Sequence, residues 1–368
     1  MQGICNNIQI YETSRFLMSK TNSDTEKRWE ALAALGSLLR KKDAELEREI
    51  RLAVQQNAWF TETFVEKSID ALAEMLNEEA LKEWKSSWAH LPSAQSPKKV
   101  GLILAGNIPL VGFHDVLYVL AAGHVASIKC SSQDKQLLPF VLQKLCTLEP
   151  TFEQQISYVE KLENFDAVIA TGSNNSSRYF DYYFSKVPHI IRKNRNSIGI
   201  IRGDESTEEL QALGNDIFDY FGLGCRNVSK LMVPKNYQFD AFFEAIESYQ
   251  QLSQHHKYLN NYDYNKSILL VNGEPHLDNG FLLLKEDKKL ASALAVLHYE
   301  TYENEQELCK QLMEQCEEIQ CIACMHPLNV TNQVVPFGAT QKPQLWDYAD
   351  GVNVMDFLLK DISTIPGK

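Results

Sequence analysis

The sequence lacks a long hydrophobic run. Its longest apolar stretches, such as residues 116–122, fall far short of the roughly 20 residues that a membrane-spanning helix needs. The N-terminus, Met1–Cys5, also lacks the basic segment and apolar core of a signal peptide. We therefore expect a cytoplasmic protein without a membrane span.

An excess of basic residues is absent too. The chain has 36 Lys and Arg against 48 Asp and Glu, a net charge of -12 at pH 7. Because nucleic-acid binding relies on basic patches, we expect no nucleic-acid partner. A nucleotide cofactor needs only a few local donors, so the charge does not argue against one. The eight cysteines are better explained as reduced thiols than as a disulfide framework.

Low-complexity tracts and the common phosphate-binding fingerprints, G-x-G-x-x-G and Walker A, are missing as well. What remains is an ordinary globular composition, 44% hydrophobic and 23% charged. A chain of 368 residues is long for one core, so two domains are the default.

Short apolar segments alternate with helix-like segments from residue 100 onward. The run 100–105 is apolar throughout, as in a strand buried on both faces. Further strands are predicted at 125–130, 155–159, 165–170, 197–202, 230–233, 267–271, 280–284, 293–299 and 319–325. Helices are predicted at 110–122, 134–148, 178–186, 208–221, 238–249 and 305–317. This alternation predicts an α/β fold with two parallel-sheet, Rossmann-like domains, preceded by amphipathic helices at 24–57 and 63–90.

Cys225 stands between Gly224 and Arg226, where a predicted helix passes into a predicted strand. The glycine allows a substrate to approach closely. A partly exposed, electropositive setting lowers the pKa of a thiol, and Arg226 supplies a nearby positive charge. The simpler interpretation is a small buried hydrophobe, the usual state of a free cysteine. Cys225 is thus a candidate nucleophile.

Three earlier segments follow predicted strands, where ligands bind in open α/β sheets. The amide of Asn107 suits a developing oxyanion, although Asn107 before Pro109 also suits a helix cap. Lys129 ends a strand and suits ribose hydroxyls or a phosphate, although such a lysine is usually just solvated. Residues 171–173, Thr-Gly-Ser, precede a helix whose first backbone amides form an anion site.

In this order the segments resemble the aldehyde dehydrogenase superfamily, and more closely its acyl-CoA reductase branch, related to the fatty-acid reductase of bacterial luminescence systems. The family's P-x-N-x-P element is similar to residues 105–109, with Ala105 for the first proline. Its A-x-x-A-G-N-x-x-x-x-K element runs through Ala122 and Gly123 to Lys129. Its T-G-S, G-Q-x-C and P-F-G elements match residues 171–173, 222–225 (with leucine at 223) and 336–338, so the resemblance spans roughly 100–337.

The resemblance implies NAD(P)H-dependent reduction of an acyl-CoA, or an acyl-carrier thioester, to an aldehyde through an acyl-cysteine. It makes Cys225 the nucleophile and Asn107 an oxyanion donor, and it implies no metal. Cofactor binding falls to Ala105, Gly106, Lys129, Thr171, Gly172 and Ser173. NADPH is favoured over NADH, with Lys129 near the 2′-phosphate. A homo-oligomer is implied by resemblance alone.

The departures from the family also carry information. Hydrolytic relatives hold a water-activating glutamate in E-L-G-G-K, and the corresponding residues 192–197 contain no carboxylate. The E-x-F-G-P glutamate is likewise missing near 289–293. Reduction needs no water-activating base, so acyl-CoA reduction is favoured. An NAD(P)-dependent aldehyde dehydrogenase and a non-catalytic nucleotide-binding interaction module of the same fold are the alternatives.

The resemblance also sets the expected domains. Residues 1–200 would hold the N-terminal helices and the nicotinamide-cofactor domain, and residues 201–332 the catalytic domain. Residues 333–368 would return to the cofactor domain.

Two patterns imitate other sites. Cys316, Cys321 and Cys324 have a plant-type iron–sulfur spacing, but no fourth ligand is obvious. His114 and His189 lie near motif ends and could protonate a leaving thiolate, although such histidines are more often structural.

Overall fold

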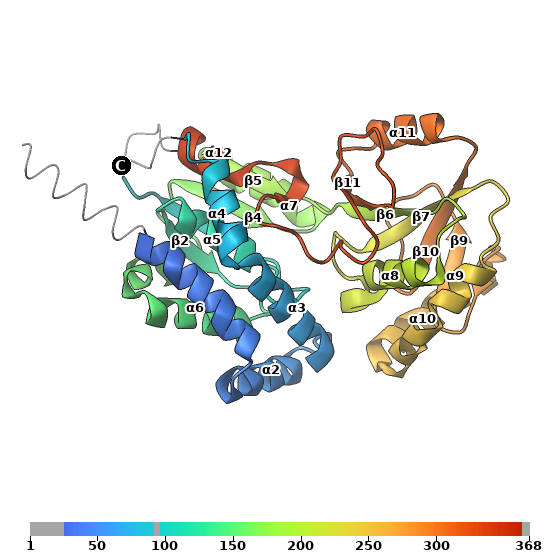
Figure 1. The fold of residues 1–368 in the computed structure, drawn as a ribbon, viewed down its shortest axis with the longest axis horizontal. Helices are drawn as coiled ribbons and strands as arrows, with labels where there is room; N and C mark the ends of the chain where they lie inside the picture. Colours follow the sequence, from blue (N-terminus) through green and yellow to red (C-terminus); the bar gives the residue numbers. More distant parts are fainter. Residues whose placement is uncertain (1–25, 92–95, 363–368) are drawn as a thin grey trace, which may run out of the picture.

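The computed structural model describes residues 26–91 and 96–362 of the chain. Two sheets form the centres of two lobes (Figure 1). The first lobe, coloured blue to green, also contains the N-terminal helices. The second carries the yellow and orange elements, and the red C-terminal segment lies between the two lobes before ending on the first.

The first sheet has five parallel strands in the order β3-β2-β1-β4-β5. They are β1 (Lys99–Ile103), β2 (Val125–Lys129), β3 (Ile156–Tyr158), β4 (Ala167–Thr171) and β5 (His189–Arg192). Its helices are α5 (Phe113–Ala121), α6 (Leu137–Leu148) and α7 (Asn174–Phe184), with the short turn η1 (Pro150–Gln155). The strand order reverses at β1, so the carboxyl ends of β1 and β4 lie at a switch point where ligands bind in such sheets. Strand β5 is missing from the sequence prediction.

The N-terminal helices pack into the core of the first lobe, as expected, but each predicted helix is two. Residues 26–41 form a helix that ends before Asp43, whose side chain accepts a hydrogen bond from the Leu46 N–H and caps α2 (Ala44–Gln56). Asn77 caps α4 (Glu78–Ser87) in the same way and separates it from α3 (Glu62–Met75). Caps of this kind fix where a helix starts, regardless of the apolar periodicity. Residue 24, where the first prediction begins, lies outside the described residues.

The second sheet has seven strands in the order β12-β11-β6-β7-β10-β9-β8. They are β6 (Asn196–Ile200), β7 (Val228–Pro234), β8 (Leu277–Asp278), β9 (Leu283–Glu286), β10 (Val296–Tyr302), β11 (Ile319–Ala323) and β12 (Val334–Val335). All pair in parallel except β8, which runs antiparallel at the edge. The α/β fold is therefore confirmed, with a second sheet that is mixed at one edge.

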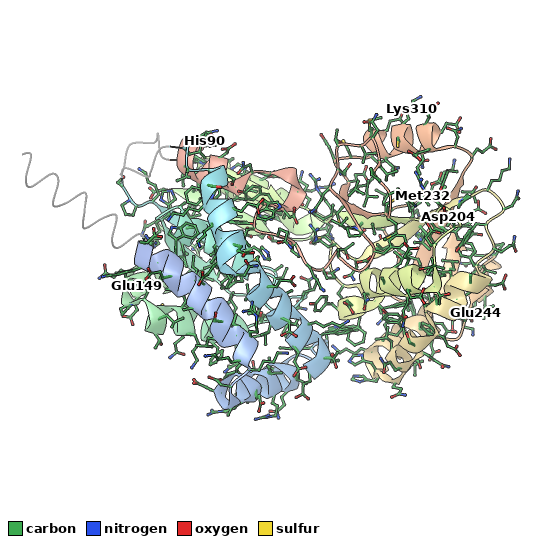
Figure 2. All side chains as sticks on the ribbon, in the orientation of Figure 1. His90, Glu149, Asp204, Met232, Glu244 and Lys310 are labelled. Carbon is green, nitrogen blue, oxygen red and sulfur yellow. The ribbon has the colours of Figure 1, made fainter. Side chains whose placement is uncertain are left out.

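Helices cover both faces of this second sheet. They are α8 (Thr207–Phe218), α9 (Asp240–Ala245), α10 (His256–Asn272) and α11 (Glu305–Glu314), with the short turns η2 (Asp219–Gly222) and η3 (Glu247–Gln254). In Figure 2, Met232 of the buried strand β7 lies between Lys310 of α11 and Glu244 of α9. The predicted strand at 267–271 is wrong, because these residues are the last turns of α10. A short apolar run does not distinguish strand from helix, and here only Leu269 of the run is buried.

The C-terminal segment belongs to both lobes. Strand β12 pairs with β11 in the second sheet. After the turn η4 (Ala349–Gly351), residues of α12 (Val354–Asp356) and η5 (Phe357–Asp361) are buried in the core of the first lobe. No helix in the described part of the chain has both the length and the apolar character needed to span a bilayer.

Candidate active site

A cleft of about 780 Å³ lies between the carboxyl ends of the first sheet and the loop that precedes β7. Both lobes line it, through residues 105–112, 171–173, 192–196, 217–218, 220–229 and 292–296. Eight described non-glycine residues have a positive φ, and five of them line this cleft: Leu110, Tyr220, Phe221, Ala295 and Asp350. Unfavourable backbone conformations concentrate at functional sites, so this clustering singles out the cleft.

The loop that carries Cys225 starts with an unusual turn. Helix α8 ends at Phe218, and the next turn contains three successive left-handed residues, Tyr220, Phe221 and Gly222, with φ of 54°, 57° and 74°. Phe64 of α3 packs against both aromatic rings. The first lobe thus supports the strained turn that aims the cysteine loop of the second lobe into the cleft.

Asn227 holds this loop from behind. Its Oδ1 accepts a 2.9 Å hydrogen bond from the Gly224 N–H, and its Nδ2 donates to the carbonyls of Asp216 and Asp219. The Ser197 hydroxyl donates to the Cys225 carbonyl at 2.9 Å. Asn227 and Ser197 are buried, so their hydrogen bonds hold the loop in a fixed shape. Cys225 itself is exposed.

Gly224 stands in close contact with side chains of both lobes. A Cβ at this position would stand 2.4 Å from Cδ1 of Ile108 and 3.0 Å from Oδ1 of Asn227. A larger residue therefore fits there only if the side chains of Ile108 and Asn227 move aside.

The thiol of Cys225 is exposed to the cleft and yet closely surrounded by protein. Desolvation raises its pKa to about 11; Arg226 and Arg192 oppose this shift, and Asp350 adds to it. Arg226 therefore acts on the thiol in the expected direction, but desolvation is the larger effect, so the net pKa of Cys225 is raised and not lowered. The Arg226 guanidinium is engaged elsewhere: Nε donates to the Thr340 carbonyl at 2.5 Å, and Nη2 donates to Gln333.

Asn107 lies opposite the cysteine loop. Its Nδ2 donates a 2.7 Å hydrogen bond to the carbonyl of Leu223, two residues before Cys225. Because α5 begins only at Phe113, with Gly112 as its cap, Asn107 is not a helix cap. One amide N–H makes this bond, and Asn107 is also among the residues that line the cleft.

Five of the six predicted cofactor residues line the same cleft: Ala105, Gly106, Thr171, Gly172 and Ser173. Ser173 caps α7 by accepting from the Ser176 N–H. Lys129 ends β2 at the same sheet edge and is exposed, but it is not among the lining residues. The structure therefore brings five of these residues together with Asn107 and Cys225, and leaves Lys129 beyond the cleft wall.

Two ion pairs in the cleft, Arg192–Asp115 and Arg195–Asp350, were not predicted from the sequence. Arg192, at the end of β5, donates to Asp115 of α5 at 2.5 Å, and both are buried. Arg195 lies 3.4 Å from Asp350, whose carboxyl pKa is raised by desolvation. The sequence showed only that residues 192–197 lack a carboxylate. Residues 193–195, Lys-Asn-Arg, directly follow β5 and could have indicated a charged wall at the sheet edge. This signal was not used because β5 was not predicted.

Of the other candidates, the three cysteines and His189 lie outside the cleft lining, and His114 lies within it. Cys321 is buried in β11, with its Sγ 3.1 Å from the Ser197 hydroxyl, and Cys324 is buried just beyond. Within residues 26–91 and 96–362, no three His, Cys, Asp or Glu side chains are grouped to hold a metal ion. The Nδ1 of His189 bonds to the Val187 carbonyl, whereas His114 lines the cleft.

Solved structures with a similar fold include aldehyde dehydrogenases. Aldehyde dehydrogenase 21 of Physcomitrella patens, described with the reaction product succinate, superposes with a TM-score of 0.62 at 14% identity, covering 90% of this chain and 79% of that one. An NADP-dependent enzyme of E. coli gives 0.60 at 14% identity, covering 85% and 77%. A Mycobacterium tuberculosis aldehyde dehydrogenase complexed with NAD+ gives 0.58 at 12%, covering 84% and 77%. The fold is therefore that of the aldehyde dehydrogenases, as the resemblance implied.

The sequence itself defines the family. Residues 17–241 match the acyl-CoA reductase (LuxC) family, which is more than half of the chain. This protein belongs to that family. Family and fold together support an oxidoreductase. No curated protein sequence shows a significant match to the chain.

Proposed function

We propose that this protein reduces an acyl-CoA, or another acyl thioester, to an aldehyde with a reduced nicotinamide nucleotide. The observation that carries the proposal is the Cys225 thiol, exposed in a cleft between the two lobes and faced by the Asn107 amide. A thiol is a nucleophile suited to thioester exchange, and the amide is a donor suited to the charge that the exchange develops.

In the first step the sulfur of Cys225 attacks the thioester carbonyl. The bond to the coenzyme A sulfur breaks, an acyl-cysteine forms, and the proton that Cys225 loses is taken up by the departing thiolate. Because the pKa of the free thiol is about 11, this proton leaves only as substrate binds or reacts. The thiol consequently stays protonated, and protected from other electrophiles, until substrate arrives.

The carbonyl oxygen becomes negatively charged during the attack. The second N–H of Asn107 and the backbone N–H of Cys225 are the donors assigned to it. Asn107 is fixed by its bond to Leu223, in the loop of Cys225 itself, so donor and nucleophile keep their relative position. Donors fixed in advance need no reorganisation as the charge develops.

The first-sheet side of the cleft fits a nucleotide. Gly106 is packed so closely on Ser131 that a Cβ would stand 2.5 Å from the serine Cβ, which joins the loops after β1 and β2 into one wall. Next to it, Gly172 and Ser173 lead into α7, whose first-turn N–H groups attract a phosphate. A reduced nicotinamide nucleotide bound there supplies a hydride to the acyl carbon. The preference for NADPH, with Lys129 at a 2′-phosphate, stays a prediction.

Once the acyl carbon is reduced, Cys225 is bound as a thiohemiacetal. Its collapse releases the aldehyde and restores the cysteine. The apolar side chains of Leu72 and Met75 from α3, with Tyr220, Leu223 and Leu294, line the cleft and suit a hydrocarbon chain. Burial of each CH₂ group there contributes about 0.8 kcal/mol, which favours acyl groups longer than acetyl.

Aldehyde oxidation is the second candidate function, because it needs a carboxylate that activates water and Asp350 lines the cleft. Asp350 lines the same cleft as Cys225, and its charge raises the pKa of the thiol, so it is the carboxylate we would assign to the activation of water. Its pairing with Arg195 argues against a free base. The stability of the acyl-cysteine in the absence of cofactor decides between the two, since a hydrolytic enzyme would release free acid.

The test is intact mass after mixing with acyl-CoAs of increasing chain length, without cofactor. We expect one stable acyl adduct on the wild type and on Cys130→Ala, but none on Cys225→Ala. Cys130 is the matched control, since burial raises its pKa to about 11 as well and it lies outside the cleft lining. Addition of NADPH or NADH should release aldehyde. Absence of an adduct with every chain would contradict the proposal, and rapid release of free acid would favour oxidation.

Cytoplasmic location, a homo-oligomer and the division into a cofactor domain and a catalytic domain are proposed together with this function.

A further inference from the structure

Unpaired polar atoms gather in the cleft. Six buried side-chain N or O atoms among the described residues have no hydrogen-bond partner, and three of them belong to residues that line the cleft: Nε2 of His114, Nε of Arg192 and Nε2 of Gln341. Buried polar atoms are almost always paired, so each exception requires an explanation. Three exceptions in one cleft indicate a missing partner.

Arg192 is the most constrained of the three. Only 7% of the residue is exposed, and its Nη2 is held by the Asp115 carboxylate at 2.5 Å. This ion pair fixes the guanidinium plane, while Nε is left without an acceptor. An unpaired donor on a buried guanidinium is costly, which makes the position poor for stability and suitable for binding an anion.

His114 and Gln341 complete the group. His114 lies in the first turn of α5, and burial together with Arg192 and Arg226 lowers its pKa to about 4, so its ring is neutral at pH 7. Gln341 follows Thr340, whose carbonyl accepts from Arg226. With the imidazole proton on Nε2, all three unpaired atoms are N–H donors.

Donors without acceptors select an anion, and the proposed reaction creates two. The oxyanion is assigned to Asn107 and the Cys225 N–H. The second anion is the departing thiolate. His114 does not offer it a charged acid, because the lowered pKa of its ring leaves it neutral at pH 7.

We propose that Arg192, His114 and Gln341 form the subsite that receives the thiolate leaving group of the substrate. This inference rests on the proposed function. The carbon–sulfur bond of the thioester breaks, its electron pair stays on the leaving sulfur, and the three N–H groups stabilise that anion until it takes up the proton released by Cys225.

The test compares two thioesters of the same acyl group, one with an alkyl thiol as in coenzyme A and one with an aryl thiol. An aryl thiol is a stronger acid and leaves without help. In Arg192→Gln we expect the rate of Cys225 acylation by the alkyl thioester to fall by about tenfold or more. The aryl thioester should react at nearly the wild-type rate. The ratio of the two rates, measured by intact mass without cofactor, is the readout.

Arg195→Gln is the matched control, because it removes a positive charge from the cleft wall but no unpaired donor; its rate ratio should stay at the wild-type value. If Arg192→Gln does not fold, as judged by circular dichroism, Gln341→Met removes one donor at similar side-chain length and should shift the ratio in the same direction. An unchanged ratio in the folded variants would overturn the subsite and leave the proposed function standing. Failure of both thioesters to acylate the wild type would instead remove the proposed function.

Discussion

The side-chain amide of Asn107 donates a hydrogen bond to the carbonyl oxygen of Leu223 at 2.7 Å. Asn107 follows β1 in the first lobe, and Leu223 precedes Cys225 in the second lobe. The bond therefore spans the cleft between the lobes and sets the spacing between an oxyanion donor and the nucleophile.

Replacement of Asn107 by Asp should separate catalysis from stability. The carboxylate has nearly the same shape but no N–H, so it neither bonds the Leu223 carbonyl nor stabilises an oxyanion. We expect the rate of Cys225 acylation to fall by about 10²–10³, as measured by intact mass over time. Asn332→Asp is the control, since Asn332 also donates to carbonyls, of Cys316 and Ile319, but lies outside the cleft lining. That variant should lose stability and keep its acylation rate. An Asn107→Asp protein with the wild-type rate would contradict the assigned role.

Alkylation of Cys225 should be slow at neutral pH. The pKa of about 11 predicts a rate with iodoacetamide that rises by about tenfold for each pH unit between 7 and 10, because only the thiolate reacts. Peptide mass spectrometry of Cys225, with Cys225→Ala to define the background, measures it. A rate that is already constant above pH 8 would show that Arg226 or Arg192 outweighs desolvation.

Gly224→Ala should disable the site through a single methyl group. The new Cβ would stand 2.4 Å from Cδ1 of Ile108, so either the Ile108 side chain has to rotate away or the cysteine loop has to shift. We expect acylation to fall by about a hundredfold, since small displacements of a reacting group have such effects. Ile108→Val removes the clashing carbon, and the double variant should recover part of the rate. A double variant no faster than Gly224→Ala would place the cause elsewhere.

Asp216 should make the unfolding free energy depend on pH. Its carboxylate accepts from the Gly338 and Thr340 N–H groups and from the Thr340 hydroxyl, yet desolvation raises its pKa to about 6 from a usual 3.8. A raised folded-state pKa gives a stabilising contribution that is complete below pH 3.8 and is lost as pH rises through 6. The contribution is about 3 kcal/mol.

Asp216→Asn removes this titration. We expect the difference in unfolding free energy between wild type and Asp216→Asn to grow in favour of the wild type by about 2–3 kcal/mol from pH 7 to pH 4. Urea denaturation at several pH values measures it. A difference that does not change with pH would contradict the raised pKa.

The sequence was sufficient to place much of the cleft because strand ends carry the motifs. Asn107 follows β1, Thr171 ends β4 and Cys225 precedes β7, and the carboxyl ends of parallel strands meet at one edge. Local patterns and the order of the segments therefore predicted which of these residues line one cleft before any contact was known.

The charged wall of the cleft could not be predicted in this way. Arg192, Asp115 and Asp350 come from β5, α5 and the C-terminal segment, and only folding joins them. The strand β5 has just four residues, and only the two isoleucines are apolar, with a histidine before them and an arginine after them. So short an apolar run does not predict a strand. The thiol pKa was predicted in the wrong direction because the sequence shows that Arg226 is next to Cys225 but does not show how far folding desolvates the thiol, and this desolvation outweighs the charge of Arg226.

The described chain passes between the two sheets twice, from β5 to β6 through residues 193–195 and from β12 back to the first core through residues 336–344. Two stretches of backbone therefore connect the lobes. Arg192 and Gln341 stand at these crossings and also line the cleft. Arg192 is held in the first lobe by Asp115, whereas Gln341 belongs to the second connection, so the distance between these two donors depends on how the lobes are joined.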